Sequence, residues 1–70
     1  MNAKYEIIIF WSEEDGTYIA DVPELAGCKA DGSTYYEALQ NAENIINEWI
    51  ETAENIGRTV PSPRGRLAFA

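Results

Sequence analysis

The stretch that decides the fold is Asp21-Val22-Pro23-Glu24-Leu25-Ala26-Gly27-Cys28, followed by Gly32-Ser33-Thr34 and a long amphipathic segment. Proline has no backbone N–H to give to a strand ladder, so Pro23 ends one strand. Gly27 permits the chain to reverse, because glycine adopts left-handed backbone angles at no steric cost. The stretch therefore predicts the end of one strand, a turn, and a short strand at residues 28–31, before a helix.

Upstream of this turn the sequence predicts a hairpin. Residues 4–11 read KYEIIIFW and are rich in β-branched and aromatic side chains, which is typical of a strand. The polar residues 12–16 end in Asp-Gly, a strong hairpin signal, and residues 17–22 form the return strand. Because side chains alternate along a strand, Ile8 and Phe10 face one side of the sheet, and Ile7, Ile9 and Trp11 face the other.

Downstream, Thr34 begins a helix. It stands three residues before Glu37, which is the spacing of a capping box, and Gly57 suits the left-handed position that ends a helix. Between them the apolar residues recur at helical spacing and predict a stripe that faces the core. The stripe consists of Tyr35, Ala38, Leu39, Ala42, Ile45, Ile46, Trp49, Ile50, Ala53 and Ile56.

Leu67 and Phe69 alternate with other residues in the segment 66–70, which predicts a short fourth strand. The predicted fold is therefore α+β with the order β-β-β-α-β. Three strands form an antiparallel meander, the helix packs on one sheet face, and a right-handed crossover places the fourth strand parallel to the first, in sheet order 3-2-1-4. Ile8, Phe10 and Ile19 would lie on the uncovered face. Such a patch is typical of an interface and predicts self-association, although burial by neighbouring side chains and loops is the alternative.

Length and cysteine content bound the class of protein. Seventy residues make a single domain of modest stability. There is no histidine, and Cys28 is the only cysteine, so neither a disulfide framework nor a structural zinc site supports the fold. Self-association is the remaining source of stability, and a dimer or tetramer is expected. A lone cysteine and no signal peptide indicate the cytoplasm. No apolar run is long enough to cross a bilayer.

Charge argues against nucleic acid as a partner. Twelve acidic residues stand against five basic ones, for a net charge of −7, whereas phosphate binding requires clustered Lys and Arg. No Lys or Arg occurs between Ala30 and Gly57, so the outer helix face is acidic without balancing cations. This face is either a solvated surface or a docking surface for a basic protein.

Catalysis is not expected. Without histidine, neither a Ser-His nor a Cys-His pair can form, and Cys28 is interpreted as a small core residue. A Mg²⁺ site would need converging carboxylates, and the candidates are Asp15, Asp21, Glu24 and Asp31. Each has a simpler interpretation as a turn or solvated strand residue. The sequence therefore predicts a non-enzymatic protein without metal or cofactor.

The chain resembles the HicB family of antitoxins. The resemblance rests on the Asp-Gly hairpin with Tyr18, on VPELAGC at residues 22–28, and on DGSTYYEALQNA at residues 31–42, and it covers nearly all of the chain. Three residues depart from the usual family pattern. Glu24 stands for Asp, Ala26 for Pro and Tyr36 for Glu.

The resemblance implies a partial ribonuclease H-like fold and binding of a small basic RNA-cleaving toxin, which the antitoxin neutralises. The family forms dimers or higher assemblies. Many members carry a C-terminal DNA-binding domain, which is not expected here because the chain ends after the fourth strand. The expected toxin-binding residues are Asp15, Asp21, Glu24, Glu48 and Glu51. The alternative is a standalone homo-oligomeric regulatory or structural domain without a toxin partner.

Overall fold

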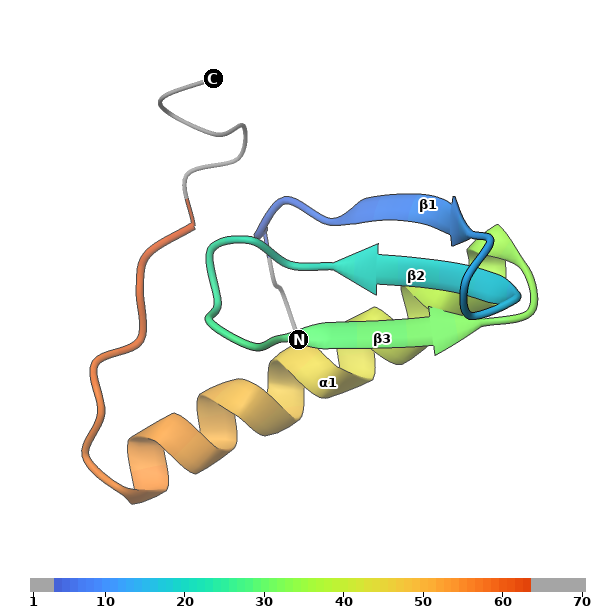
Figure 1. Cartoon of the computed structure of the whole chain (residues 1–70). Coiled ribbons are helices and arrows are strands. Elements are labelled where there is room, and N and C mark those ends of the chain that lie inside the picture. The colour runs from blue at the N-terminus through green and yellow to red at the C-terminus, as the bar shows by residue number, and fades with distance from the viewer. Residues whose placement is uncertain (1–3, 64–70) are drawn as a thin grey trace.

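A computed structural model describes residues 4–63, which form three antiparallel strands and one helix (Figure 1). The strands are β1 (Ile8–Ser12), β2 (Thr17–Asp21) and β3 (Lys29–Gly32), and the helix is α1 (Tyr35–Asn55). The sheet order is β1-β2-β3, and α1 covers one face. The predicted α+β class and the antiparallel meander are confirmed. The predicted fourth strand, 66–70, lies outside the described residues.

The strand boundaries differ from the prediction because pairing limits them. Ile8 pairs with Asp21, the last residue of β2, so residues 4–7 have no partner on β2 and are not part of β1. The Val22 N–H donates to the Cys28 carbonyl at 3.0 Å, which closes the loop between β2 and β3. The predicted strands 4–11, 17–22 and 28–31 are therefore corrected to Ile8–Ser12, Thr17–Asp21 and Lys29–Gly32.

Two glycines make the turns that connect the strands. Gly16 has a φ of 65° and its N–H donates to the Ser12 carbonyl at 2.8 Å, which closes the hairpin between β1 and β2. Gly27 has a φ of 75° in the turn that leads into β3. Both values lie in the left-handed region that favours glycine, so the predicted turn positions are confirmed.

Both ends of α1 are capped, with one difference from the prediction. The Thr34 hydroxyl accepts a hydrogen bond from the Glu37 N–H at 3.0 Å, as expected for an N-cap. The Glu37 carboxylate, however, bonds the N–H and hydroxyl of Ser33, one residue earlier than a capping box requires. At the other end, Gly57 has a φ of 73°, and the Arg58 N–H donates to the Ala53 carbonyl. This is the Schellman arrangement.

The core between sheet and helix changes in character along α1. Where α1 begins, the core contains the small side chains of Ala20, Ala38 and Ala42. Farther along, it contains larger side chains, namely Tyr5, Val22, Leu25, Cys28 and Ile46. At the first end the backbones of β3 and α1 approach closely, because a Cβ on Gly32 would collide with the backbone of Glu37 and Ala38. Gly32 is therefore required by close approach rather than by a special φ angle.

Three residues expected on the core side are largely exposed. Tyr35 and Ile56 lie at the two ends of the helical stripe, and their side chains are 59% and 68% exposed. Trp11, at the end of β1, is 47% exposed. For Ile56 the reason is length. A helix of 21 residues is about 31 Å long, whereas a strand of five residues spans about 17 Å, so the sheet cannot cover the whole stripe. Trp11, Tyr18 and Tyr35 pack as a row of aromatic rings instead.

We predict that Gly32→Ala destabilises the protein more than Gly16→Ala does. At Gly32 the added methyl collides with the helix backbone, and the expected loss in free energy of unfolding is about 2–3 kcal/mol. At Gly16 the methyl meets open space, and only the left-handed φ costs energy, about 1 kcal/mol. Urea denaturation followed by circular dichroism measures both. Equal losses would contradict a close approach between β3 and α1.

Candidate functional site

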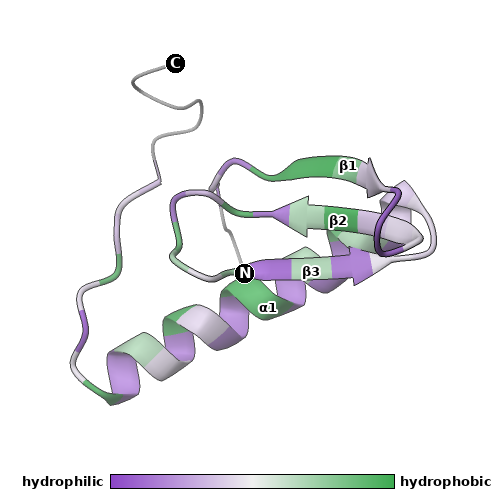
Figure 2. Ribbon diagram, viewed as in Figure 1, coloured by the Kyte–Doolittle hydropathy of each residue, from purple (hydrophilic) through white to green (hydrophobic). Residues whose placement is uncertain are grey.

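The sheet face opposite α1 brings the predicted self-association residues together. Phe10 pairs directly with Ile19 across β1 and β2, and Ile8 lies two residues from Phe10 on the same face. Phe10 is 46% exposed and Ile8 is 38% exposed. Figure 2 shows that β1 is mainly hydrophobic, whereas β3 is mainly hydrophilic. We refer to Ile8, Phe10 and Ile19 as the apolar patch.

Charged residues of both signs border the apolar patch. Across the sheet from β1 to β3, Ile8 lies beside Asp21, which lies beside Lys29. In the same way, Phe10 lies beside Ile19, which lies beside Asp31. The β3 side therefore carries one cation and one anion. A patch with charges of both signs is compatible with a second copy of itself, because a two-fold axis can place opposite charges together.

The predicted acidic residues of the sheet do not form one site. Asp15 lies in the hairpin, where its N–H donates to the Ser12 hydroxyl and its carboxylate accepts from that hydroxyl. Asp21 lies at the opposite end of the sheet, because it pairs with the first residue of β1. Glu24 follows in the turn between β2 and β3, and its negative charge contributes to raising the pKa of Tyr5, after burial of that ring. Asp15 is therefore separated from Asp21 and Glu24 by the length of the sheet.

The remaining predicted residues, Glu48 and Glu51, lie on the outer side of α1, away from the sheet. Both side chains are exposed, and so are the other glutamates of this helix, Glu37, Glu43 and Glu54. We call these glutamates the acidic helix face. Hydrogen bonds from the Ser33 amide and hydroxyl lower the pKa of the Glu37 carboxyl group. The acidic helix face carries the largest group of like charges in the described part of the chain.

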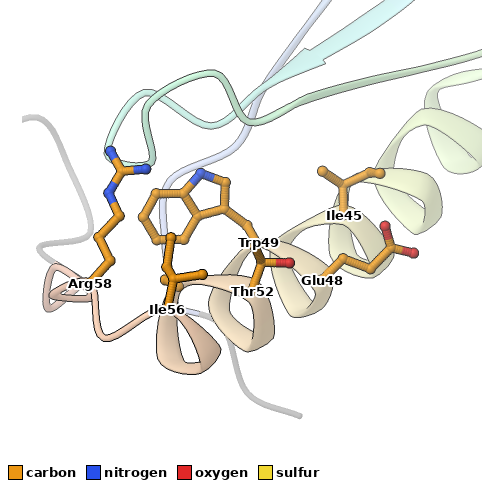
Figure 3. A pocket seen from close by; sticks show the side chains of 7 residues that line it. Ile45, Glu48, Trp49, Thr52, Ile56 and Arg58 are labelled. Atoms are coloured by element: carbon orange, nitrogen blue, oxygen red, sulfur yellow. The ribbon is translucent and has the colours of Figure 1, made fainter.

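A cavity of about 260 Å³ lies beside the C-terminal half of α1 (Figure 3). Its lining includes Ile45, Glu48, Trp49, Thr52, Ile56 and Arg58. In Figure 3 the Trp49 indole lies between Arg58 on one side and Ile45 with Glu48 on the other. The cavity thus combines an apolar floor with an anionic end and a cationic end.

Two contacts fix the Trp49 ring. Its Nε1–H donates to the Ala26 carbonyl at 3.0 Å, which ties the helix to the turn between β2 and β3. The Arg58 guanidinium lies 5.4 Å from the ring centroid, within the range of a cation–π interaction. The ring is therefore held in place before any partner binds.

The helical spacing of apolar residues predicts Trp49 as part of the core stripe and gives no indication of this cavity. The lengths of the elements nevertheless indicate that part of this stripe lies outside the core. The apolar stripe extends to Ile56, beyond what five-residue strands can cover, so part of it had to border something other than the sheet. The contact between Arg58 and Trp49 depends on the helix C-cap, which redirects the chain, and has no comparable sequence signal.

Cys28 lies in the core, as expected. It is 1% exposed and packs among the larger core side chains. Burial raises the pKa of its thiol, and the nearby negative charge of Asp21 raises it further. A buried thiol with a raised pKa is a poor nucleophile at neutral pH. Within residues 4–63, no group of three or more Cys, Asp and Glu side chains is placed to hold a metal ion.

A sequence profile of the UPF0150-like family matches residues 1–61. The chain belongs to the UPF0150-like family. Among its relatives are UPF0150 protein ssl0259 of Synechocystis, 34% identical over 91% of this chain and 86% of that one, and UPF0150 protein Ta0767 of Thermoplasma acidophilum, 40% identical over 83% of each. A UPF0150 protein of Archaeoglobus fulgidus is 29% identical over 70% of this chain. No solved structure matches significantly.

The only helix in the part of the UPF0150-like chain that the structure describes is too polar to cross a bilayer.

We predict that Cys28 of this UPF0150-like protein reacts slowly with a thiol reagent. At pH 8 the rate with Ellman's reagent should be at least about tenfold below that of free cysteine, because the raised pKa leaves less thiolate and burial blocks access. The rate should recover in denaturing urea, which serves as the control. A folded protein that reacts as fast as free cysteine would contradict a core position.

Proposed function

We propose that this UPF0150-like chain is a non-enzymatic binding module of the HicB type, which neutralises a small basic RNA-cleaving toxin in the cytoplasm. The observation that carries the proposal is the acidic helix face. Its glutamates are all exposed, and no Lys or Arg occurs between Ala30 and Gly57 to balance them. A surface of one sign speeds the encounter with a partner of the opposite sign. A small basic protein is such a partner.

The finer fold is part of the same proposal. In a partial ribonuclease H-like fold, a fourth strand formed by residues 66–70 would lie parallel to β1. Two features of the described residues support it. β1 is an edge strand with a free side in the sheet order β1-β2-β3. Residues after the helix return towards the sheet, because the Tyr5 hydroxyl donates to the Pro61 carbonyl at 2.6 Å. The chain leaving α1 is thus tied to the segment that precedes β1.

Neutralisation in this proposal is steric and electrostatic and involves no chemical step. The sequence has no histidine, and the single thiol is buried with a raised pKa. Direct binding of nucleic acid is not part of the proposal, because the net charge is −7 and the protein would repel phosphate. Glu48 and Glu51 are the main candidates for toxin contact, since both lie on the acidic helix face. Asp15, Asp21 and Glu24 remain candidates at the two ends of the sheet.

Self-association through the apolar patch is the second part of the proposal. Ile8, Phe10 and Ile19 form one continuous apolar group on a sheet face that no other described element covers. Its mixed charged border fits a second copy, whereas the acidic helix face would repel one. A standalone homo-oligomeric domain without a toxin is the alternative function, and the apolar patch is the observation that favours it.

The deciding experiment is a pull-down with tagged protein from the native lysate, read by mass spectrometry. Under the antitoxin proposal it recovers a stoichiometric basic partner of roughly 60–90 residues, which is lost at high salt because screening weakens charge attraction. The purified partner should cleave RNA, and addition of this chain should stop the cleavage. Recovery of the bait alone as a salt-resistant oligomer would favour the standalone domain.

We predict that Ile8→Asp dissociates the oligomer. A charge within the apolar patch would have to be buried in the interface, which is costly. Sedimentation should show the mass falling to that of one chain. Tyr36→Asp is the matched control, because Tyr36 is also a large exposed side chain, at 68%, but lies at the start of α1. An unchanged mass for Ile8→Asp would exclude this face as the interface.

We also predict that the double change Glu48→Lys with Glu51→Lys slows association with the basic partner by roughly tenfold at low salt, by removing electrostatic steering. The double change Glu13→Lys with Glu14→Lys is the control. It alters the net charge equally, but in the exposed hairpin. Stopped-flow or surface-binding kinetics measure both. If only the hairpin pair slows association, the toxin docks at the hairpin instead of at α1.

A further inference from the structure

An apolar cavity lies beside the acidic helix face. The cavity at the C-terminal half of α1 shares one residue, Glu48, with the acidic helix face. Thr52, one turn farther along α1, and Ile56, the C-cap residue, continue the lining, and the Ile56 side chain is 68% exposed. An exposed Ile beside an exposed cavity leaves apolar surface in contact with water. Such surface is typical of a site that a partner covers.

We infer that this cavity receives an apolar side chain from a basic segment of the partner protein. The inference rests on the proposed function, since it assigns the anchor point of the same partner. Trp49 forms the floor, and its ring is already fixed by the hydrogen bond to the Ala26 carbonyl and the cation–π contact with Arg58. A fixed aromatic floor binds an apolar side chain with little further loss of conformational freedom. Interfaces concentrate their binding energy at buried aromatic and arginine residues of this kind.

The charges at the two ends of the cavity give the segment a direction. Arg58 closes one end and would repel a cation of the partner. Glu48 lies at the other end, and Glu51 follows one turn along the acidic helix face. A Lys or Arg next to the inserted side chain is therefore expected on the Glu48 side. The occupant is defined by this chemistry as one aliphatic side chain with a Lys or Arg on its Glu48 side.

Two synthetic peptides test the inference without the natural partner. The probe is acetyl-Lys-Lys-Leu-Lys-Lys-amide, which offers Glu48 a cation in either direction of the peptide backbone. The comparison is the same peptide with Ala in place of Leu. Both carry the same charge, so any difference reports the cavity. We expect the Leu peptide to bind about tenfold more tightly, as the burial of a Leu side chain predicts. Binding is followed by NMR at the indole N–H of Trp49.

Thr52→Phe provides the blocking variant, because Thr52 is exposed and lines the cavity. It should reduce the Leu-to-Ala preference to less than twofold. Asn47→Phe is the matched control, since it adds the same ring at an exposed position of α1 outside the lining, and it should keep the tenfold preference. Equal binding of the two peptides to the unchanged protein, or a preference that survives Thr52→Phe, would overturn the inference.

The outcomes also separate this inference from the proposed function. If a basic partner is captured from the lysate while the peptides bind equally, the acidic helix face is the docking surface and the cavity is not. If the peptides differ and no basic partner is captured, the cavity binds apolar cationic segments and the antitoxin role fails.

Discussion

The close approach of α1 to the sheet at Gly32 is the constraint on which the rest of the structure depends. At this point the helix backbone lies so near β3 that a single methyl group would collide with it. The neighbouring core positions are alanines, which allow the same short distance. Farther along α1 the core side chains are larger, with Leu25, Ile46 and Tyr5 among them. The layer between sheet and helix is therefore thin at one end and thick at the other.

This wedge shape determines which parts of the chain contact the C-terminal half of α1. As Figure 1 shows, the helix runs beyond the strands and diverges from them. The sheet therefore cannot bury its last turns, and the turn between β2 and β3 reaches Trp49 through the Ala26 carbonyl instead. The opposite side of Trp49 borders the cavity. One packing geometry thus has two results. The helix contacts the sheet through small residues at one end, and Trp49 borders the cavity near the other end.

The surfaces differ in the kind of partner that their charges permit. The sheet face combines the apolar patch with Lys29, Asp21 and Asp31, so the lysine of one copy can lie opposite an aspartate of a second copy. The acidic helix face carries only negative charge, so a protein that docked on it would have to be cationic. In the proposed function these two surfaces serve self-association and toxin binding separately, which allows an oligomer to bind several partners at once.

The sequence by itself determined the local features, because each depends on a few adjacent residues. The turns at Gly16 and Gly27, the N-cap at Thr34 and the left-handed Gly57 were all predicted correctly, as were the meander and the residues that form the apolar patch. Only the tertiary structure decided how far the strands extend, since pairing partners set their ends. It also decided that Gly32 is needed for close packing, and that Trp49, Arg58 and Glu48 surround a cavity. Those contacts depend on the angle between helix and sheet, which side-chain volumes across the whole core determine.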